Sequence, residues 1–252
     1  MDTPRPASSV DDVSREPVSP PGERLPESFL ARLQPPDRDF LLDGCVPRAF
    51  PANVVLFHRR DLSDFAVFLL SGWVKVSTEA LNGHEALLAI RGPGDVLGEL
   101  AAIDGRPRSA TVRTLMPVRA AILPADRFLS RLRHRPQIAL TLLGEVADRL
   151  RESDSRRLGF GAHTVPERLA AYLLELAEAH GRAVADGTEI DVPLSQRELA
   201  GAIGASREAV ARCLRILRER RVVVTTRRRL VVLLPQVLRS IAMNVHIDTE
   251  QR

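Results

Sequence analysis

The sequence GDVLGEL at residues 94–100, followed by RPRSAT at residues 106–111, contains the groups needed to hold one small phosphate ester. Arg108 offers a planar, permanently charged set of donors that suits a phosphate diester, and Ser109 adds a hydroxyl donor. Gly98 lets the backbone come close to an anion, so that amide N–H groups can bind it. The combination predicts a phosphate-binding turn.

Glu99 needs a different role, because an ionised carboxylate only accepts hydrogen bonds and is repelled by a phosphate. The 2′-OH of a ribose is a suitable donor to it. The stretch therefore predicts a cyclic-nucleotide site. The side chains and backbone expected to line it are those of Gly98, Glu99, Leu100, Arg108 and Ser109. An ordinary hairpin with a surface arginine and glutamate is the alternative interpretation.

A second informative run is LSQRELAGAIGASREAVAR at residues 194–212. Ser195 and Glu198 have the spacing of a capping box, which predicts the start of a helix. Gly204 ends this helix and permits a sharp turn, and Ser206 caps a second helix. Two short helices joined by a glycine turn predict a helix-turn-helix. The side chains expected at the base edges are Arg207, Glu208 and Arg212.

The first stretch resembles the phosphate-binding cassette of cyclic-nucleotide-binding β-roll domains. The second resembles the helix-turn-helix of the Crp/Fnr family of bacterial transcription regulators, in the branch that responds to cAMP. In that family the recognition helix opens Ser-Arg-Glu, as at residues 206–208, and an arginine follows four residues after the glutamate, as does Arg212. The resemblance implies an α+β protein with an N-terminal β-roll, a long dimerisation helix and a C-terminal winged helix-turn-helix.

Five segments are expected along the chain. Residues 1–24 are rich in Pro, Ser, Asp and Glu and are expected to be a disordered tail. Short apolar runs bounded by Gly, Pro or Asn predict an antiparallel roll within a domain at residues 25–135. A dimerisation helix and hinge are expected at residues 136–161, a winged helix-turn-helix domain at residues 162–240, and a C-terminal tail at residues 241–252.

The long helix is predicted to begin at Pro136, which suits the first helical position. A stripe at spacings of four and three suits packing on a second copy of the chain. It consists of Ile138, Leu142, Val146, Leu150 and Ser153. The resemblance implies that this helix is the axis of a homodimer, and a core helix of a monomer is the alternative. Gly159 and Gly161 predict a hinge.

The resemblance also implies that two adjacent polar residues of this helix close over the base of the nucleotide. The aligned pair is Ser153 and Asp154. Asp154 departs from the usual Ser, Thr or Asn: its carboxylate can accept from the amino group of adenine but cannot donate to a ring nitrogen. Alternatively, it points to water and pairs with Arg157. cAMP is the expected ligand, while cGMP, another cyclic nucleotide or an empty roll remain alternatives.

Basic residues are concentrated in the C-terminal part of the chain. Residues 195–229 contain ten Arg and three Glu, a balance of +7, although the whole chain carries only +4. This is the charge pattern of a DNA-binding surface. A short strand is expected at residues 189–192, and a β-hairpin at residues 222–233 is expected to form the wing. Its tip would present Arg227, Arg228 and Arg229 to phosphate, unless it is simply a solvated turn.

The resemblance to the Crp/Fnr family implies specific contacts with DNA. Arg207 and Arg212 would address guanines and Glu208 a cytosine amino group, in TGTGA-like half-sites of an inverted repeat. Ser195 and Gln196 would contact DNA phosphates. Double-stranded DNA and a second copy of the chain are the expected partners, with RNA polymerase as a further candidate.

Several functional classes are not expected. No apolar run approaches the about 18 residues that span a membrane, and no signal peptide begins the chain, which favours a cytoplasmic protein. Two cysteines cannot build a disulfide framework or an iron–sulfur site. The histidines lack paired metal spacing, and no nucleophile is paired with a base. We therefore expect no catalytic residue, no metal and no prosthetic group. A cyclic-nucleotide sensor that acts through protein partners is the alternative from another class.

Overall fold

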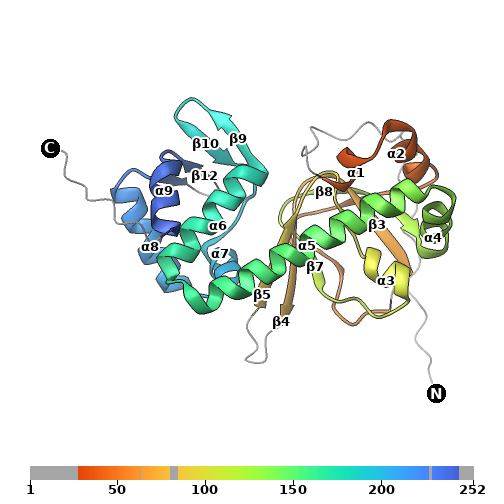
Figure 1. Ribbon diagram of the computed structural model, residues 1–252, viewed down its shortest axis with the longest axis horizontal. Coiled ribbons are helices and arrows are strands. Elements are labelled where there is room, and N and C mark those ends of the chain that lie inside the picture. Colours follow the sequence, from red (N-terminus) through yellow and green to blue (C-terminus); the bar gives the residue numbers. More distant parts are fainter. Residues whose placement is uncertain (1–27, 63, 80–84, 227–228, 244–252) are drawn as a thin grey trace, which may run out of the picture.

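The computed structural model describes residues 28–62, 64–79, 85–226 and 229–243. The molecule is elongated, and the long helix α5 (Pro136–Ala162) links two groups of elements that lie at its two ends (Figure 1). One group is a β-roll with short helices, and the other is a helical domain with a small sheet. This arrangement confirms the predicted α+β architecture.

The roll consists of two four-stranded antiparallel sheets. The first has the order β1 (Val46–Phe50), β8 (Val118–Pro124), β3 (Phe65–Ser71) and β6 (Val96–Leu97). The second has the order β2 (Val55–Phe57), β7 (Thr111–Thr114), β4 (Val74–Glu79) and β5 (Glu85–Arg91). Residues from both sheets share one apolar core, which includes Phe57, Val67, Leu69, Val112 and Ala120. The strands of the roll run from Val46 to Pro124, within the stretch where the sequence predicts it.

Four short helices complete this half of the chain. They are α1 (Phe29–Arg32), α2 (Pro35–Leu42), α3 (Glu99–Asp104) and α4 (Ala125–His134). Phe29, Phe68 and Phe128 are fully buried together and join α1 and α4 to strand β3. Helices α3 and α4 are not predicted from the sequence. Helix α4 follows β8 without a loop, and six of its ten residues are polar or charged, so that Phe128 carries much of its apolar contact.

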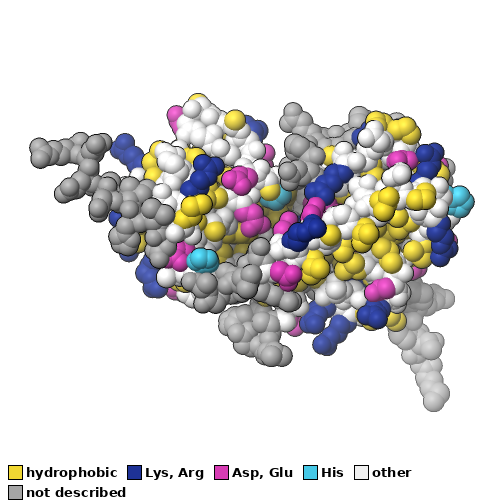
Figure 2. Space-filling view, in the orientation of Figure 1, with side chains coloured by type: hydrophobic (Ala, Val, Ile, Leu, Met, Phe, Trp, Pro, Cys, Tyr) yellow, Lys and Arg dark blue, Asp and Glu magenta, His cyan; other side chains and the backbone are white. Residues whose placement is uncertain are grey.

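Helix α5 has apolar residues on two faces, and the predicted stripe mixes them. Ile138 and Leu142 are only 0% and 3% exposed, because they belong to the core beside α1 and α4. The prediction that these two residues pack on a second copy is therefore wrong. Among the described side chains of α5, the large apolar ones that are exposed are Leu140, Leu143 and Leu150. Figure 2 shows hydrophobic side chains gathered on the face where α5 crosses the roll.

The backbone of α5 stays helical through Gly159 and Gly161 and ends at Ala162. Only His163 and Thr164 separate it from α6 (Val165–His180), which begins with a capping box between Thr164 and Glu167. The chain therefore changes direction after the two glycines, and a hinge at them stays a prediction.

The second domain packs helices against a four-stranded antiparallel sheet. The helices are α6, α7 (Gln196–Ile203), α8 (Arg207–Glu219) and α9 (Pro235–Ala242). The sheet has the order β11 (Val223–Thr226), β12 (Arg229–Val232), β10 (Gly187–Ile190) and β9 (Gly181–Val184). The expected strand at residues 189–192 is thus shifted: it spans residues 187–190 and pairs with β9, which the sequence analysis misses because β9 contributes no fully buried residue.

The two domains touch through β4 and β5. A Cβ atom at Gly201 of α7 would lie 3.2 Å from the carbonyl oxygen of Glu85, so the helix and strand are in close contact. Lys75 Nζ donates to Glu85 at 2.8 Å and lies 3.7 Å from a carboxylate oxygen of Glu198. Helix α7 therefore packs against the second sheet of the roll, at β4 and β5.

Candidate functional site

A cavity of about 460 Å³ opens between β5, the start of α3 and the side of α5. It is lined by six of the seven residues expected at the ligand, which are Gly98, Glu99, Leu100, Arg108, Ser109 and Ser153. The seventh, Asp154, is exposed and does not line this cavity. The side chain of Arg157, its alternative partner, lies outside the described residues. Residues 50 positions apart in the chain thus meet at one site.

Arg108 is inserted into the wall of this cavity and is only 2% exposed. Its guanidinium donates to the carbonyl oxygens of Gly98 and Phe65, both at 2.8 Å, and lies 4.0 Å from the ring centroid of Phe57. Burial lowers its pKa from the usual value, and its Nε donates to no described group. Arg108 therefore keeps an unused donor in a partly dry site.

Gly98 is required for this arrangement. Its φ of +72° lies in the left-handed region, and a Cβ atom there would lie 1.8 Å from Arg108 Nη1. Only glycine accommodates both the backbone conformation and the approach of the guanidinium. The turn and the buried arginine are therefore one structural unit.

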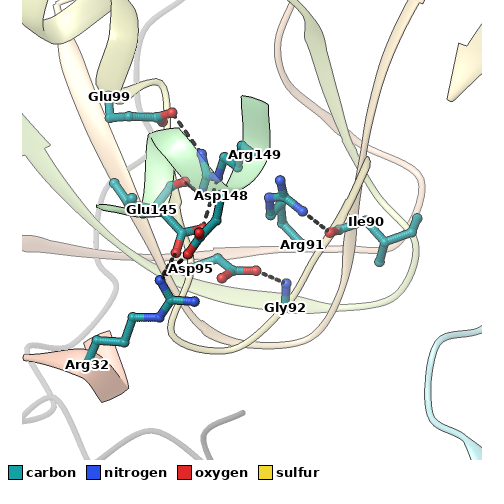
Figure 3. Close-up of polar contacts among 10 residues, drawn as sticks. Arg32, Ile90, Arg91, Gly92, Asp95, Glu99, Glu145, Asp148 and Arg149 are labelled. Carbon is teal, nitrogen blue, oxygen red and sulfur yellow. Dashed lines mark hydrogen bonds and ion pairs between the residues drawn. The ribbon is translucent and has the colours of Figure 1, made fainter. Parts of the chain in front are cut away.

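Glu99 faces the long helix. Its carboxylate, 5% exposed, accepts a hydrogen bond from Arg149 Nη1 at 2.8 Å (Figure 3). Arg149 also donates to Glu145 at 2.9 Å and to the Val96 carbonyl at 3.0 Å. Burial alone would lower the pKa of Arg149, but the two carboxylates raise it above its usual value. This network connects α3 directly to α5.

The sequence analysis misses Arg149, although it lies four residues before Ser153 and so on the same helix face. It also misses Arg91, the last residue of β5, which lines the cavity two positions after Ala89. A third lining residue, Ala202, belongs to α7 of the second domain. Its position depends on how the two domains pack, which no local pattern reveals.

The helix-turn-helix has the local geometry that its sequence predicts. Ser195 Oγ accepts from the Glu198 backbone N–H at 3.3 Å, while the Glu198 carboxylate accepts from the Ser195 N–H at 2.7 Å. Gly204 has a φ of +60°, and Ser206 caps α8 by accepting from the Ala209 N–H at 3.1 Å. The turn therefore has a physical cause at each position.

Helix α8 separates its apolar and polar faces. Val210, Leu214 and Leu217 are buried. The three residues expected at the base edges, Arg207, Glu208 and Arg212, are exposed. Ser195, Gln196, Arg207 and Glu208 line a second hollow, whose opposite wall includes Lys75 and Glu85 of the roll.

Comparisons with known proteins agree with this geometry. A model of the cyclic nucleotide-binding domain matches residues 47–135, and a model of the Crp-like helix-turn-helix domain matches residues 167–241. The chain is 35% identical over 168 residues, 67% of its length and 75% of the relative, to the CRP-like cAMP-activated global transcriptional regulator of Mycobacterium tuberculosis. The chain belongs to the Crp/Fnr family of transcription regulators.

A second relative of this Crp/Fnr regulator is the cyclic AMP receptor protein of Thermus thermophilus, 30% identical over 191 residues, which are 76% of this chain and 85% of the relative. The structure of FixK2 from Bradyrhizobium japonicum has the same fold, with a TM-score of 0.69 at 21% identity over 78% of this chain and 96% of that one. The protein is therefore a DNA-binding transcription regulator with a cyclic-nucleotide-binding domain, and not an enzyme.

The wing of this Crp/Fnr regulator differs from expectation at one residue. Arg229, expected in the turn, begins β12, and its guanidinium donates to both carboxylate oxygens of Glu189, at 2.7 and 3.0 Å. Arg227 and Arg228 lie outside the described residues, as do the two tails predicted at residues 1–24 and, for the most part, 241–252. Arg229 thus has a structural partner within the sheet.

In the described part of the chain, no three His, Cys, Asp or Glu side chains are grouped as they would be around a metal ion. Cys45 and Cys213 are both free thiols, and burial raises the pKa of Cys45 to about 11. None of the described helices combines the length and the apolar character needed to cross a bilayer.

Proposed function

We propose that this regulator is a homodimer that binds an inverted-repeat operator under the control of a cyclic nucleotide held in the roll cavity. One observation carries the proposal: the cavity is lined together by Arg108 of the roll, Ser153 of α5 and Ala202 of α7. A molecule bound there would contact the nucleotide-binding domain, the long helix and the first helix of the helix-turn-helix. Occupancy of one site can thus change the relative positions of all three.

The ligand class follows from the chemistry of the lining groups. Arg108 Nε, a buried donor with no described partner, and the exposed Ser109 hydroxyl are the groups proposed for a phosphate, and Glu99 is the group proposed for a ribose hydroxyl. Gly98 and Leu100 would border the sugar and phosphate. A volume of about 460 Å³ is in the range of small-molecule sites. The names of both relatives specify cAMP, which makes cAMP the first nucleotide to test.

The exposed face of α5 supports a dimer. Leu140, Leu143 and Leu150 are 59%, 64% and 62% exposed, and their spacings of three and seven residues follow a heptad. Two copies would bury these side chains against each other. Asp154 lies four residues after Leu150 on the same face, so we propose that it approaches the cavity of the second copy.

At the operator, Arg207 and Arg212 would donate to O6 and N7 of guanines and Glu208 would accept from a cytosine amino group. Ser195, Gln196 and the wing arginines Arg227 and Arg228 would contact phosphates. Half-sites close to TGTGA, about 34 Å apart, would match two recognition helices related by a two-fold axis. RNA polymerase is a proposed further partner, and the cytoplasm is the proposed location.

The test is a titration of labelled duplexes with the full-length chain, followed by fluorescence anisotropy. One duplex carries two TGTGA half-sites, and the control duplex has the same composition in scrambled order. Saturating cyclic nucleotide is expected to tighten operator binding by about 5- to 150-fold, as is usual for allosteric coupling. Equal affinity for the two duplexes would contradict the operator assignment, and affinity that neither cAMP nor cGMP changes would contradict cyclic-nucleotide control.

A further inference from the structure

Arg91 is a charged group in the cavity that the proposed phosphate and ribose contacts do not use. It is partly buried, and its Nη1 donates to the carbonyl oxygen of Ile90 at 2.9 Å (Figure 3). Among the described side chains, no carboxylate lies within ion-pair distance of its guanidinium. Burial and the nearby Arg149 both lower the pKa of Arg91 from its usual value. A guanidinium in this setting lowers stability unless an acceptor pairs with it.

Arg91 and Glu99, the proposed ribose contact, lie on different sides of Arg149 (Figure 3). Both residues line the cavity, as does Arg108. If Arg108 holds the phosphate and Glu99 holds the ribose, Arg91 is the charged group of β5 that remains for the base.

Two residues of α5, Glu152 and Ser153, also line the cavity, and the Glu152 carboxylate is near enough to act on the charge of Arg91. The base end therefore offers a fork of donors from Arg91 and an acceptor pair from the Glu152 carboxylate. A base that fits must present hydrogen-bond acceptors to the Arg91 guanidinium and donors to the Glu152 carboxylate.

Guanine meets this requirement with two hydrogen bonds to each group, whereas adenine can offer only one to each. O6 and N7 of guanine accept a bidentate pair of hydrogen bonds from an arginine, and its N1–H and 2-amino group donate to a carboxylate. Adenine places an amino donor where guanine has O6, facing the guanidinium, and an unprotonated N1 where a carboxylate needs a donor. The donor and acceptor pattern of the cavity thus distinguishes the two purines.

We infer that Arg91, together with Glu152, selects a guanine base, so that this regulator binds cGMP more tightly than cAMP. The inference rests on the proposed cyclic-nucleotide function and narrows it. It also separates this chain from the two relatives whose names specify cAMP.

The test is calorimetric titration of the full-length protein with cAMP, cGMP and cIMP. cIMP keeps O6, N7 and N1–H but lacks the 2-amino group, so it separates the contribution of Arg91 from part of that of Glu152. The expected order of affinity is cGMP, then cIMP, then cAMP, with about tenfold or more between the first and the last, as one bidentate base contact allows.

Variants assign the preference to its residues. Arg91→Leu is expected to weaken the binding of cGMP and of cIMP by about tenfold or more, while the affinity for cAMP changes by less than about threefold. Glu152→Gln should weaken cGMP more than cIMP. Arg119→Leu, at an exposed position of β8, is the matched control and should change none of the three. Arg91→Lys keeps the positive charge but lacks the paired donors of the guanidinium. This variant replaces Arg91→Leu if thermal unfolding shows that Arg91→Leu is not folded.

Each outcome decides the matter. Tighter binding of cAMP than of cGMP by the unaltered protein, or an equal effect of Arg91→Leu on both, overturns the guanine assignment and leaves the proposed function intact. Absence of binding by every cyclic nucleotide overturns both. A preference for cGMP that disappears in Arg91→Leu and in Arg91→Lys, but not in Arg119→Leu, supports the inference.

Discussion

Gly98 and Arg108 show how a single hydrogen atom in place of a methyl group determines a binding site. The guanidinium occupies the space that any other residue at position 98 would need for its Cβ atom. The aromatic rings of Phe57 and Phe65 then hold the arginine from the other side. The arginine is therefore placed before a ligand arrives, which reduces the entropic cost of binding.

Substitution of Gly98 by Ala should lower stability and abolish nucleotide binding. The left-handed backbone costs about 1–2 kcal/mol for a residue with a Cβ atom, and the methyl group would also displace Arg108. Gly105→Ala is a matched control, because its φ is +67° but nothing lies within 4 Å of the added Cβ. Thermal unfolding and calorimetry check this. Retention of full nucleotide affinity in Gly98→Ala would contradict the role of Arg108.

Arg207→Ala should reduce the preference for the operator over a scrambled duplex by roughly 5- to 150-fold, since a bidentate base contact is worth about 1–3 kcal/mol. Binding to the scrambled duplex should remain and should still weaken with added salt. The control is Arg215→Ala, an exposed arginine two turns further along α8 that is near Glu219. An unchanged operator preference in Arg207→Ala, measured by anisotropy, would refute the assignment.

Adjacent residues of helix α5 lie on its buried and its exposed face. Leu142 is 3% exposed and belongs to the core of the roll domain, while Leu143 is 64% exposed. Adjacent leucines on one helix therefore serve the fold and the proposed dimer, respectively. Hydrophobic spacing alone does not reveal which face packs on which partner.

These neighbours allow a paired experiment. Leu142→Ala should cost about 2–5 kcal/mol of unfolding free energy, because it leaves a cavity in a packed core. Leu143→Ala should cost little stability but should weaken self-association. Chemical unfolding and sedimentation equilibrium measure the two effects. If Leu143→Ala leaves the association constant unchanged, α5 does not form the dimer interface as proposed.

A structural feature is predictable from the sequence when the residues that cause it lie close together along the chain. The helix-turn-helix is predicted residue by residue, because the capping hydrogen bonds of Ser195, Gly204 and Ser206 span only three or four positions. The cavity-lining residues at 98–100 and 108–109 are likewise predicted from a short stretch. Arg149 is missed because its partner Glu99 is 50 positions away. Helix α4 and strand β9 are missed because they offer few buried apolar residues to form a pattern.

At the scale of the whole molecule, the two domains are joined by a buried contact. The ring of His180, at the end of α6, lies against Trp73 of the roll, with centroids 4.7 Å apart. Burial lowers the pKa of His180 to about 4. The imidazole is therefore neutral in the folded protein at pH values where an unfolded chain would begin to bind a proton.

Stability should consequently fall as the pH falls. Between the unfolded pKa of about 6.5 and the folded value, the unfolded chain gains a proton that the folded chain does not, so the loss at pH 5 is about 2 kcal/mol. Above pH 7 this contribution is constant. His180→Phe should remove this part of the pH dependence, whereas His134→Phe, at an exposed site, should keep it. Chemical unfolding at pH 7.5 and 5 checks both, and equal slopes in His180→Phe and the unaltered protein would contradict the assignment.

Ala202 belongs to the first helix of the helix-turn-helix and also forms part of the cavity wall. Linkage requires that if nucleotide binding changes the affinity for an operator, the operator changes the affinity for nucleotide by the same factor. DNA is then itself an effector of the nucleotide site. A regulator bound to a strong operator would therefore bind nucleotide at a lower nucleotide concentration than a regulator that is not bound to DNA. A genetic screen for altered effector response should accordingly recover substitutions in α7 at positions that contact no base.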